Sequence, residues 1–220
     1  MNNLSSEIQQ NFVKSNTSLV GLVCKEGIVL GADRRATAGN LIVTKDFKKI
    51  VKINDYIAAS FTGGVSDAQL TIKIIAAELR LKELKTKVRP TAKEAANLLA
   101  LMIYRNIRTP TMIPNIVGTL IAGVDEDGST YLYTIEPSGS ISEVKDYDAN
   151  FSSGMPFILG LLERQFKKDI TIKEGIELAK ECIKSSTQRD VGSGNGIDVF
   201  TITKDGIKHV VSEEIVAHYK

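Results

Sequence analysis

Apolar and polar positions follow two different periods along this chain, and the two kinds of segment come in groups. Short apolar runs bounded by polar or glycine-containing turns predict five strands in the first part of the chain. These strands are predicted at 19–24, 28–32, 41–44, 50–53 and 56–61. The period then changes to that of a helix, which predicts helices over 66–84 and 92–107.

The second half of the chain repeats this grouping. Strands are predicted at 116–124 and 130–135, with a weaker one at 141–144, followed by helices at 157–166 and 173–184 and a final hairpin of 197–203 and 207–211. Two helix starts carry a capping box, Thr91 with Glu94 and Thr171 with Glu174. Because strands and helices are grouped and do not alternate, the order predicts an α+β protein with antiparallel sheets and helices packed outside them.

Composition narrows the class of protein without identifying it. The 220 residues are 43% hydrophobic and 25% charged, which is typical of one soluble globular domain. A net charge of +2 gives no reason to expect nucleic acid or an anionic membrane as a partner. The sequence contains neither a run that could span a membrane nor a secretory signal, so we expect a cytoplasmic protein.

Cysteine and histidine usage limits the chemistry. Cys24 and Cys182 are predicted to be buried thiols in a reducing compartment, although the sequence alone leaves a disulfide open. Their spacing does not suggest a zinc site. The two histidines, His209 and His218, are expected at the surface or at a sheet edge. An acyl-transfer enzyme with this sequence would therefore work without histidine.

Thr17 is the first candidate for chemistry, because it stands at the start of the first predicted strand. A threonine hydroxyl becomes a good nucleophile when its own free α-amine acts as the base, and that would require removal of the first sixteen residues. The alternative is structural, since a β-branched residue commonly begins a strand.

A carboxylate and two lysines form the second candidate group. Asp33 ends a predicted strand, and Lys48 and Lys49 precede the strand at 50–53. Alternation predicts that one lysine points inward, where an Asp partner would hold its ammonium beside a nucleophile. Such a cation keeps a nearby α-amine neutral, and a free α-amine already has a pKa of about 7.7–8.0. The alternative is a surface ion pair of little energetic value.

Two glycine-rich segments complete the candidates. Thr62-Gly63-Gly64 and the segment 192–196 are predicted turns whose backbone N–H groups would bind an oxyanion or a phosphate. Neither matches a P-loop, and a simple tight turn is the alternative for each.

Taken together, these segments resemble the β-subunits of the 20S proteasome core, and the archaeal type most closely. The matching segments are Thr17-Ser18-Leu19-Val20-Gly21, Gly31-Ala32-Asp33-Arg34-Arg35, Lys48-Lys49, Thr62-Gly63-Gly64 with Ser66-Asp67-Ala68-Gln69, Ser153-Gly154-Met155-Pro156-Phe157, and Gln188-Arg189-Asp190 with Gly192-Ser193-Gly194 and Gly196-Ile197-Asp198. The resemblance implies an N-terminal-nucleophile hydrolase with a four-layer αββα sandwich, two antiparallel sheets lying between helix layers.

The resemblance also implies a threonine-type endopeptidase that needs no metal or organic cofactor. Thr17 would supply the nucleophile and, as a free amine, the proton relay. Asp33 and Lys49 would tune its amine and hydroxyl, and the Gly63 N–H would bind the oxyanion. The residues expected to surround and orient the new N-terminus are Ser153, Asp190 and Ser193.

The implied organisation is a propeptide of residues 1–16, removed on maturation by Thr17 itself, and a single catalytic domain of residues 17–220. Family members form heptameric β-rings, homomeric or mixed, stacked between α-rings, with fourteen subunits of each kind. They degrade unfolded polypeptides that an ATP-dependent unfoldase delivers through the α-rings. Neither nucleic acid nor a membrane is an implied partner.

Two positions depart from the family pattern. Asn16 stands where family members usually have glycine, and Ser18 stands where archaeal relatives often have threonine. The alternative functions are a non-catalytic structural β-subunit that stays unprocessed because of Asn16, and a small-molecule amidohydrolase of the same fold. By carry-over, an apolar substrate pocket is implied, and it predicts cleavage after apolar residues. Its residues are Ala36, Phe47, Val51, Phe61 and Val65.

Overall fold

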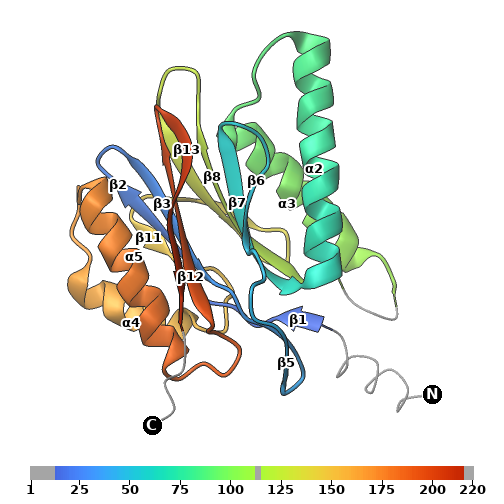
Figure 1. Ribbon diagram of the computed structural model, residues 1–220. Coiled ribbons are helices and arrows are strands. Elements are labelled where there is room, and N and C mark those ends of the chain that lie inside the picture. The colour runs from blue at the N-terminus through green and yellow to red at the C-terminus, as the bar shows by residue number, and fades with distance from the viewer. Residues whose placement is uncertain (1–12, 112–114, 216–220) are drawn as a thin grey trace.

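Two antiparallel sheets lie face to face between two layers of helices in the computed structural model, which describes residues 13–111 and 115–215 (Figure 1). The first sheet has the order β10-β9-β8-β7-β1-β4-β5, with β6 also paired to β7. Its strands are β1 (Val13–Ser15), β4 (Ala36–Ala38), β5 (Leu41–Thr44), β6 (Ile50–Lys52), β7 (Ile57–Gly64), β8 (Val117–Val124), β9 (Thr130–Ile135) and β10 (Ile141–Val144).

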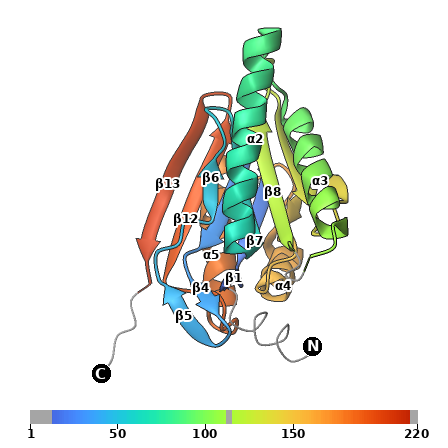
Figure 2. The same cartoon turned by 90° about the vertical axis from the view of Figure 1, so that its right-hand side faces the viewer.

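The second sheet has the order β11-β2-β3-β12-β13. Its strands are β2 (Leu19–Cys24), β3 (Gly27–Asp33), β11 (Tyr147–Asp148), β12 (Gly196–Thr203) and β13 (Gly206–Glu214). The outer layers are α2 (Val65–Thr86) with α3 (Ala92–Arg108), and α4 (Met155–Gln165) with α5 (Ile172–Thr187). Figure 2 looks onto the α2 and α3 side. This arrangement confirms the predicted αββα sandwich.

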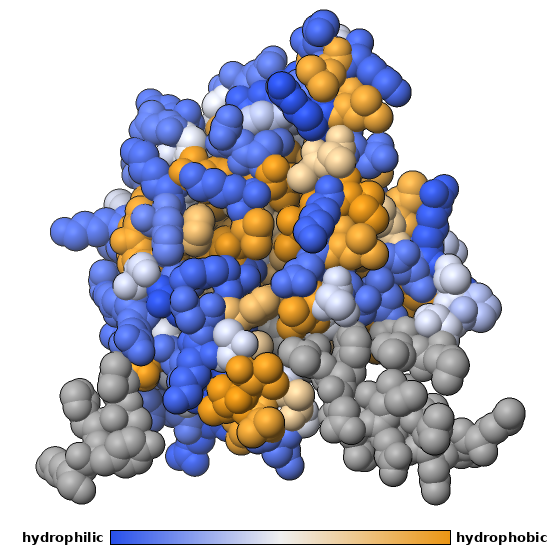
Figure 3. Space-filling view, turned by 45° about the vertical axis from the view of Figure 1, so that its right-hand side comes forward, coloured by the Kyte–Doolittle hydropathy of each residue, from blue (hydrophilic) through white to orange (hydrophobic). Residues whose placement is uncertain are grey.

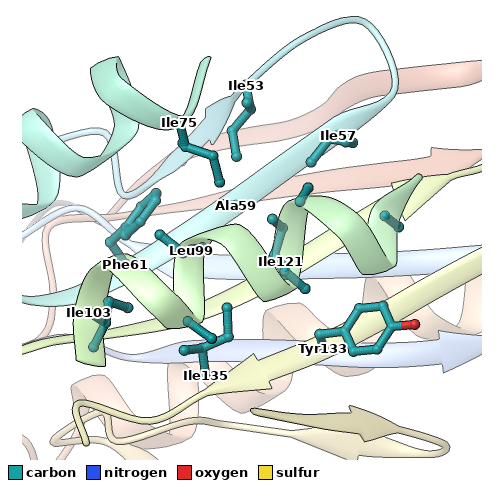
Figure 4. Close-up of a cluster of buried hydrophobic side chains, with 14 of the residues drawn as sticks. Ile53, Ile57, Ala59, Phe61, Ile75, Leu99, Ile103, Ile121, Tyr133 and Ile135 are labelled. Carbon is teal, nitrogen blue, oxygen red and sulfur yellow. The ribbon is translucent and has the colours of Figure 1, made fainter. Parts of the chain in front are cut away.

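Three apolar clusters hold the four layers together. One joins α2 and α3 to the first sheet and includes Ile75, Leu99 and Ile121 (Figure 4). A second joins α4 and α5 to the other sheet, and the third lies between the two sheets. Burial of large aliphatic side chains contributes about 1.5–3 kcal/mol for each one, so these interfaces dominate the stability of the fold.

The predicted capping boxes set the starts of α3 and α5. In α3 the Thr91 side chain accepts from the Glu94 N–H, and the Glu94 carboxylate accepts from the Thr91 N–H; Thr171 and Glu174 do the same in α5. Each pair satisfies two backbone donors that the helix leaves open. No helix within 13–111 and 115–215 is both long and apolar enough to cross a bilayer.

The glycine-rich segment 62–64 differs from its prediction. Thr62-Gly63-Gly64 was expected to be a turn, but these residues are the last three of β7. Gly63 has a φ of +108°, and a Cβ there would lie 2.1 Å from the carbonyl oxygen of Ile116. Glycine is therefore needed at this position for a strand end with unusual backbone angles, and not for a turn.

The strand β1 has no counterpart in the sequence-based prediction. It lies before Thr17 and bridges β4 and β7, with Lys14 opposite both Thr37 and Gly64. The short strands β4, which pairs with β1, and β11, which lies in the other sheet, also escaped prediction, because two or three residues carry too little periodicity. An extended segment pairs here because its backbone satisfies N–H and C=O groups on the two strand edges that face it.

Candidate active site

Thr17 lies at the entrance of β2 and is fully buried. Its backbone N–H donates a hydrogen bond to the Ser153 hydroxyl, with 2.9 Å between nitrogen and Oγ. Ser153 lies in the turn before α4, and its own hydroxyl donates to the Asp190 carboxylate over 2.7 Å. The backbone nitrogen of Thr17 is thus linked through one hydroxyl to a carboxylate, which is an arrangement suited to proton transfer.

Asp33 and Lys49 form an ion pair on the inner side of Thr17. Lys49 Nζ lies 2.6 Å from Asp33 Oδ1, and both side chains are fully buried. The carboxylate also accepts backbone N–H groups from Ser18 at 2.9 Å, Arg35 at 2.9 Å and Gly194 at 2.8 Å. This many donors offset the cost of burying the charge, as burial of an ion pair requires.

Lys49 contacts the bond that precedes Thr17. Its Nζ donates to the carbonyl oxygen of Asn16 over 3.1 Å. Burial lowers the pKa of Lys49, while the negative charge and hydrogen bond of Asp33 oppose that shift. A buried ammonium aimed at a carbonyl oxygen stabilises the negative charge that forms there when a nucleophile attacks.

Asp190 is the centre of a cluster on the other side of Thr17. Its Oδ2 accepts from both the Ser153 and Ser193 hydroxyls, and its Oδ1 accepts from the Gly192 N–H at 3.1 Å. Because Ser193 gives its proton to Asp190, the 2.7 Å contact between Ser18 Oγ and Ser193 Oγ is donated by Ser18. The cluster ties the segment 190–193 to the start of β2.

The structure therefore gathers six of the seven predicted site residues through direct hydrogen bonds: Thr17, Asp33, Lys49, Ser153, Asp190 and Ser193. Gly63 lies beside them on β7, opposite Ser15 of β1. The hydrogen bond described to the Asn16 carbonyl oxygen comes from Lys49. An oxyanion role for Gly63 stays a prediction.

An apolar cavity of about 480 Å³ opens next to Lys49. Phe47, Val51 and Phe61 line it, as predicted for the substrate pocket, whereas Ala36 and Val65 are not among its lining residues. Lys48 and Lys49 also line it, and helix α2 supplies the opposite wall with Ala68, Gln69, Ile72 and Lys73. The volume is large enough for a single large side chain.

Arg35 is a supporting residue to which the sequence analysis gave no role. Its Nε donates to Asn195 Oδ1 over 2.9 Å, and its Nη1 donates to the Val191 carbonyl oxygen over 2.8 Å. Gly194, which lies between these two, has a φ of +151° and packs against the guanidinium. Arg35 therefore fixes the segment 191–195. The only feature of the sequence that could have suggested this contact was the presence of a basic residue at position 35 and of a glycine-rich segment at 192–196.

Within the described residues, the histidine and the two cysteines have ordinary structural roles. His209 is on β13, where its Nε2 lies 2.9 Å from Asp198 and its ring stacks on Phe200. His218 falls outside the described residues. Cys24 and Cys182 are free and buried, and burial raises the pKa of each thiol to about 12.

Fold and site together define a class: αββα sandwiches in which a buried lysine–aspartate pair and a serine–aspartate cluster flank a threonine at a strand entrance. A family model described as "Proteasome subunit" matches residues 13–202. The chain belongs to this family of proteasome subunits.

The relatives narrow the type of subunit. The chain is 38% identical over 216 residues to the "Proteasome subunit beta" of Methanococcus maripaludis strain C5, covering 98% of this chain and 96% of the relative. It is 40% identical over 197 residues to that of Nanoarchaeum equitans, covering 90% and 98%. With that of Archaeoglobus profundus it shares 41% over 209 residues, covering 95% and 94%. The resemblance to an archaeal-type proteasome β-subunit is thereby confirmed.

Proposed function

We propose that this chain is the catalytic β-subunit of a 20S proteasome core, a threonine-type endopeptidase with Thr17 as its nucleophile. Residues 1–16 are a pro-segment, and residues 17–220 are the catalytic domain. The observation that carries the proposal is the position of Lys49, whose ammonium contacts Asp33 at 2.6 Å and the Asn16 carbonyl oxygen at 3.1 Å. A purely structural subunit has no need to bury a charged lysine at this bond.

In the proposed reaction, the released α-amine of Thr17 accepts the hydroxyl proton, directly or through a water, as Oγ attacks the scissile carbonyl of a substrate. Lys49 keeps the amine neutral and stabilises the negative charge, and Gly63 adds a backbone N–H to the oxyanion. Ser153, Asp190 and Ser193 hold the new N-terminus in place. The resulting ester is hydrolysed by water, which returns the threonine hydroxyl and amine.

The path of β1 supports the proposal, because it gives a direction for substrate binding. The backbone of 13–15 pairs antiparallel with both β4 and β7 and leads to the bond before Thr17. A polypeptide substrate would add to the sheet in the same way, with its backbone giving affinity and its side chains entering pockets. The cavity lined by Phe47, Val51 and Phe61 favours cleavage after apolar residues.

Exposed apolar side chains support assembly into rings with α-subunits. They gather on the outer face of α2 and on β5 (Figure 3). The residues are Leu70, Ile74, Leu81 and Leu84 on α2, and Leu41, Ile42 and Val43 on β5. Exposed apolar patches of this kind mark protein–protein contacts. We propose heptameric β-rings between α-rings in the cytoplasm, supplied with unfolded polypeptides by an ATP-dependent unfoldase.

The test is an intact-mass and N-terminal analysis of the chain after co-expression with the α-subunit of its own organism, combined with peptide hydrolysis. The expected result is a chain that begins at Thr17 and hydrolyses peptides ending in Leu or Tyr faster than those ending in Arg or Glu. The variant Thr17→Ala should assemble and be inactive. An assembled chain that still carries residues before Thr17 and lacks activity would instead make this a structural subunit.

A further inference from the structure

Asn16 brings a reactive amide to the bond that must be cut. Its side chain packs against Gly192: a Cβ at that glycine would lie 2.1 Å from Asn16 Cβ and 3.1 Å from Asn16 Nδ2. Only glycine at 192 leaves room for this side chain. The Asn16 amide thus lies beside the segment that carries Asp190, whose carboxylate accepts the Gly192 N–H.

The carbonyl of Asn16 is activated in place. Lys49 Nζ donates to its oxygen over 3.1 Å, which makes the carbonyl carbon more electrophilic and stabilises an oxyanion formed from it. This activation does not depend on which nucleophile attacks. The side-chain nitrogen of Asn16 reaches the same carbon through a five-membered ring, and such intramolecular attacks are strongly favoured over intermolecular ones.

The opposite cyclisation, in which the Thr17 nitrogen attacks the Asn16 side chain, releases ammonia and leaves the chain uncut, so it does not free Thr17. The Thr17 N–H donates to Ser153 Oγ at 2.9 Å. The same contact helps the Thr17 nitrogen to leave, because the Ser153 hydroxyl can deliver a proton to it. Asp190, 2.7 Å from that hydroxyl, accepts the proton that Asn16 Nδ2 loses.

We propose that Asn16 cleaves the Asn16–Thr17 bond by cyclisation, as a route of activation that does not use the Thr17 hydroxyl. Asn16 Nδ2 bonds to the Asn16 carbonyl carbon, and the bond from that carbon to the Thr17 nitrogen breaks. Asp190 takes one proton from Nδ2, and Ser153, which Asp190 reprotonates, gives one proton to the Thr17 nitrogen. The products are a free Thr17 α-amine and a fragment ending in an aminosuccinimide. Water opens this ring to asparagine or isoasparagine.

The proposal rests on the proposed function, in which a free Thr17 amine is the purpose of the cut. Its chemistry is nevertheless distinct from attack by the Thr17 hydroxyl. That route passes through an ester and releases a fragment ending only in ordinary asparagine with a free α-carboxylate. The end of the released fragment therefore separates the two routes.

The decisive experiment uses Thr17→Ala and Thr17→Val in the full chain, co-expressed with the α-subunit of its own organism. Neither variant can form the ester, and valine keeps the shape of threonine. We expect cleavage after Asn16 in both, with a released fragment lighter by one water than the linear peptide and convertible to a hydroxamate by hydroxylamine. Adding Asn16→Gln, which keeps the amide but requires a six-membered ring, should slow this cleavage by roughly tenfold or more.

Two results would overturn the proposal: Thr17 variants that stay uncut while the wild-type chain is cut, or a cut that releases only a linear acid. The wild-type fragment provides a second measurement that needs no variant, because isoasparagine at its end arises only from the cyclic route. Asn16→Gly distinguishes this failure from failure of the proposed function. If it is processed and hydrolyses peptides while Thr17→Ala stays uncut, the endopeptidase stands and the cyclisation does not.

Discussion

The two groups of residues that flank Thr17 differ in depth and in origin. The Lys49 pair, Asp33 with Lys49, is fully buried; Asp33 is the last residue of β3 in one sheet, and Lys49 immediately precedes β6 in the other. The Asp190 cluster, Asp190 with Ser153 and Ser193, comes from turns next to α4 and α5. Its depth varies, because Ser153 is exposed, Asp190 is half-buried and Ser193 is fully buried. The comparison teaches that residues at the sheets hold the buried charge pair, whereas the groups of the proposed proton path come from turns.

The largest effect should follow from breaking the Lys49 pair. Lys49→Ala leaves the Asp33 carboxylate buried without its cation, so the free energy of unfolding should fall by about 3–5 kcal/mol and peptide hydrolysis should be lost. Denaturant unfolding and a peptide assay measure the two effects. The double variant Asp33→Asn with Lys49→Met should recover most of the stability and none of the activity. Full stability in Lys49→Ala would contradict the role given to this pair.

A smaller and different effect is expected in the Asp190 cluster. Asp190→Asn keeps an acceptor for both serine hydroxyls but removes the charge that draws their protons. Hydrolysis should fall by about 10²- to 10⁴-fold, as for loss of a general acid or base. The thermal midpoint of unfolding should change less than in Lys49→Ala. If Asp190→Asn unfolds as readily as Lys49→Ala, the contrast between the two groups fails.

The difference in the pH dependence of stability between the wild-type chain and Lys49→Met should report on Lys49. The buried thiols of Cys24 and Cys182, whose pKa is raised to about 12, contribute equally to both proteins. Burial lowers its pKa from the ordinary value of 10.5, so the folded chain releases this proton at a lower pH than the unfolded chain. Between those two pKa values the unfolded state binds more protons, and stability therefore rises with pH. Unfolding by urea from pH 7 to 10 should show the stability of the wild-type chain rising relative to that of Lys49→Met. Parallel curves of stability against pH for the two proteins would contradict a lowered pKa of Lys49 in the folded chain.

The smallest effect is predicted for Ser18, which joins the two groups. Ser18→Ala removes the 2.7 Å contact with Ser193 but keeps the backbone N–H that Asp33 accepts. The expected cost is about 1 kcal/mol of stability, with a change in hydrolysis rate below about tenfold. Ser18→Thr, which retains a hydroxyl, is the matched control and should restore the loss. A loss as large as that of Asp190→Asn would place Ser18 within the proton path.

Sequence patterns predicted the longer strands and the helices, because the strands are apolar runs bounded by turns and the helices show helical periodicity or a capping box. Alternation along a strand also predicted that one of Lys48 and Lys49 points inward, but the resemblance identified Lys49 as that residue and Asp33 as its partner. Thr62-Gly63-Gly64 was assigned wrongly, because glycine punctuates both turns and irregular strand ends. The resemblance, and not the periodicity, brought Ser153 and Asp190 to the site.

Contacts between segments far apart in the sequence were beyond prediction. The clamp of Arg35 on Val191 and Asn195 joins positions about 160 residues apart, and no local pattern encodes it. The same holds for the contact of Lys49 with the Asn16 carbonyl oxygen. The strand β1 was missed for a different reason: its three residues pair because two strand edges receive them, and not because of their own periodicity.

If residues 1–16 are removed as proposed, the place of β1 makes them a tethered competitor of the substrate until the cut. Because 13–15 lie between β4 and β7 and are covalently joined to Thr17, they occupy the strand position at the high effective concentration that a short connection provides. No free polypeptide matches that concentration before the bond is cut. Under the proposed function, activation is therefore a single irreversible step, whose rate depends on the chain itself and not on how much substrate surrounds it.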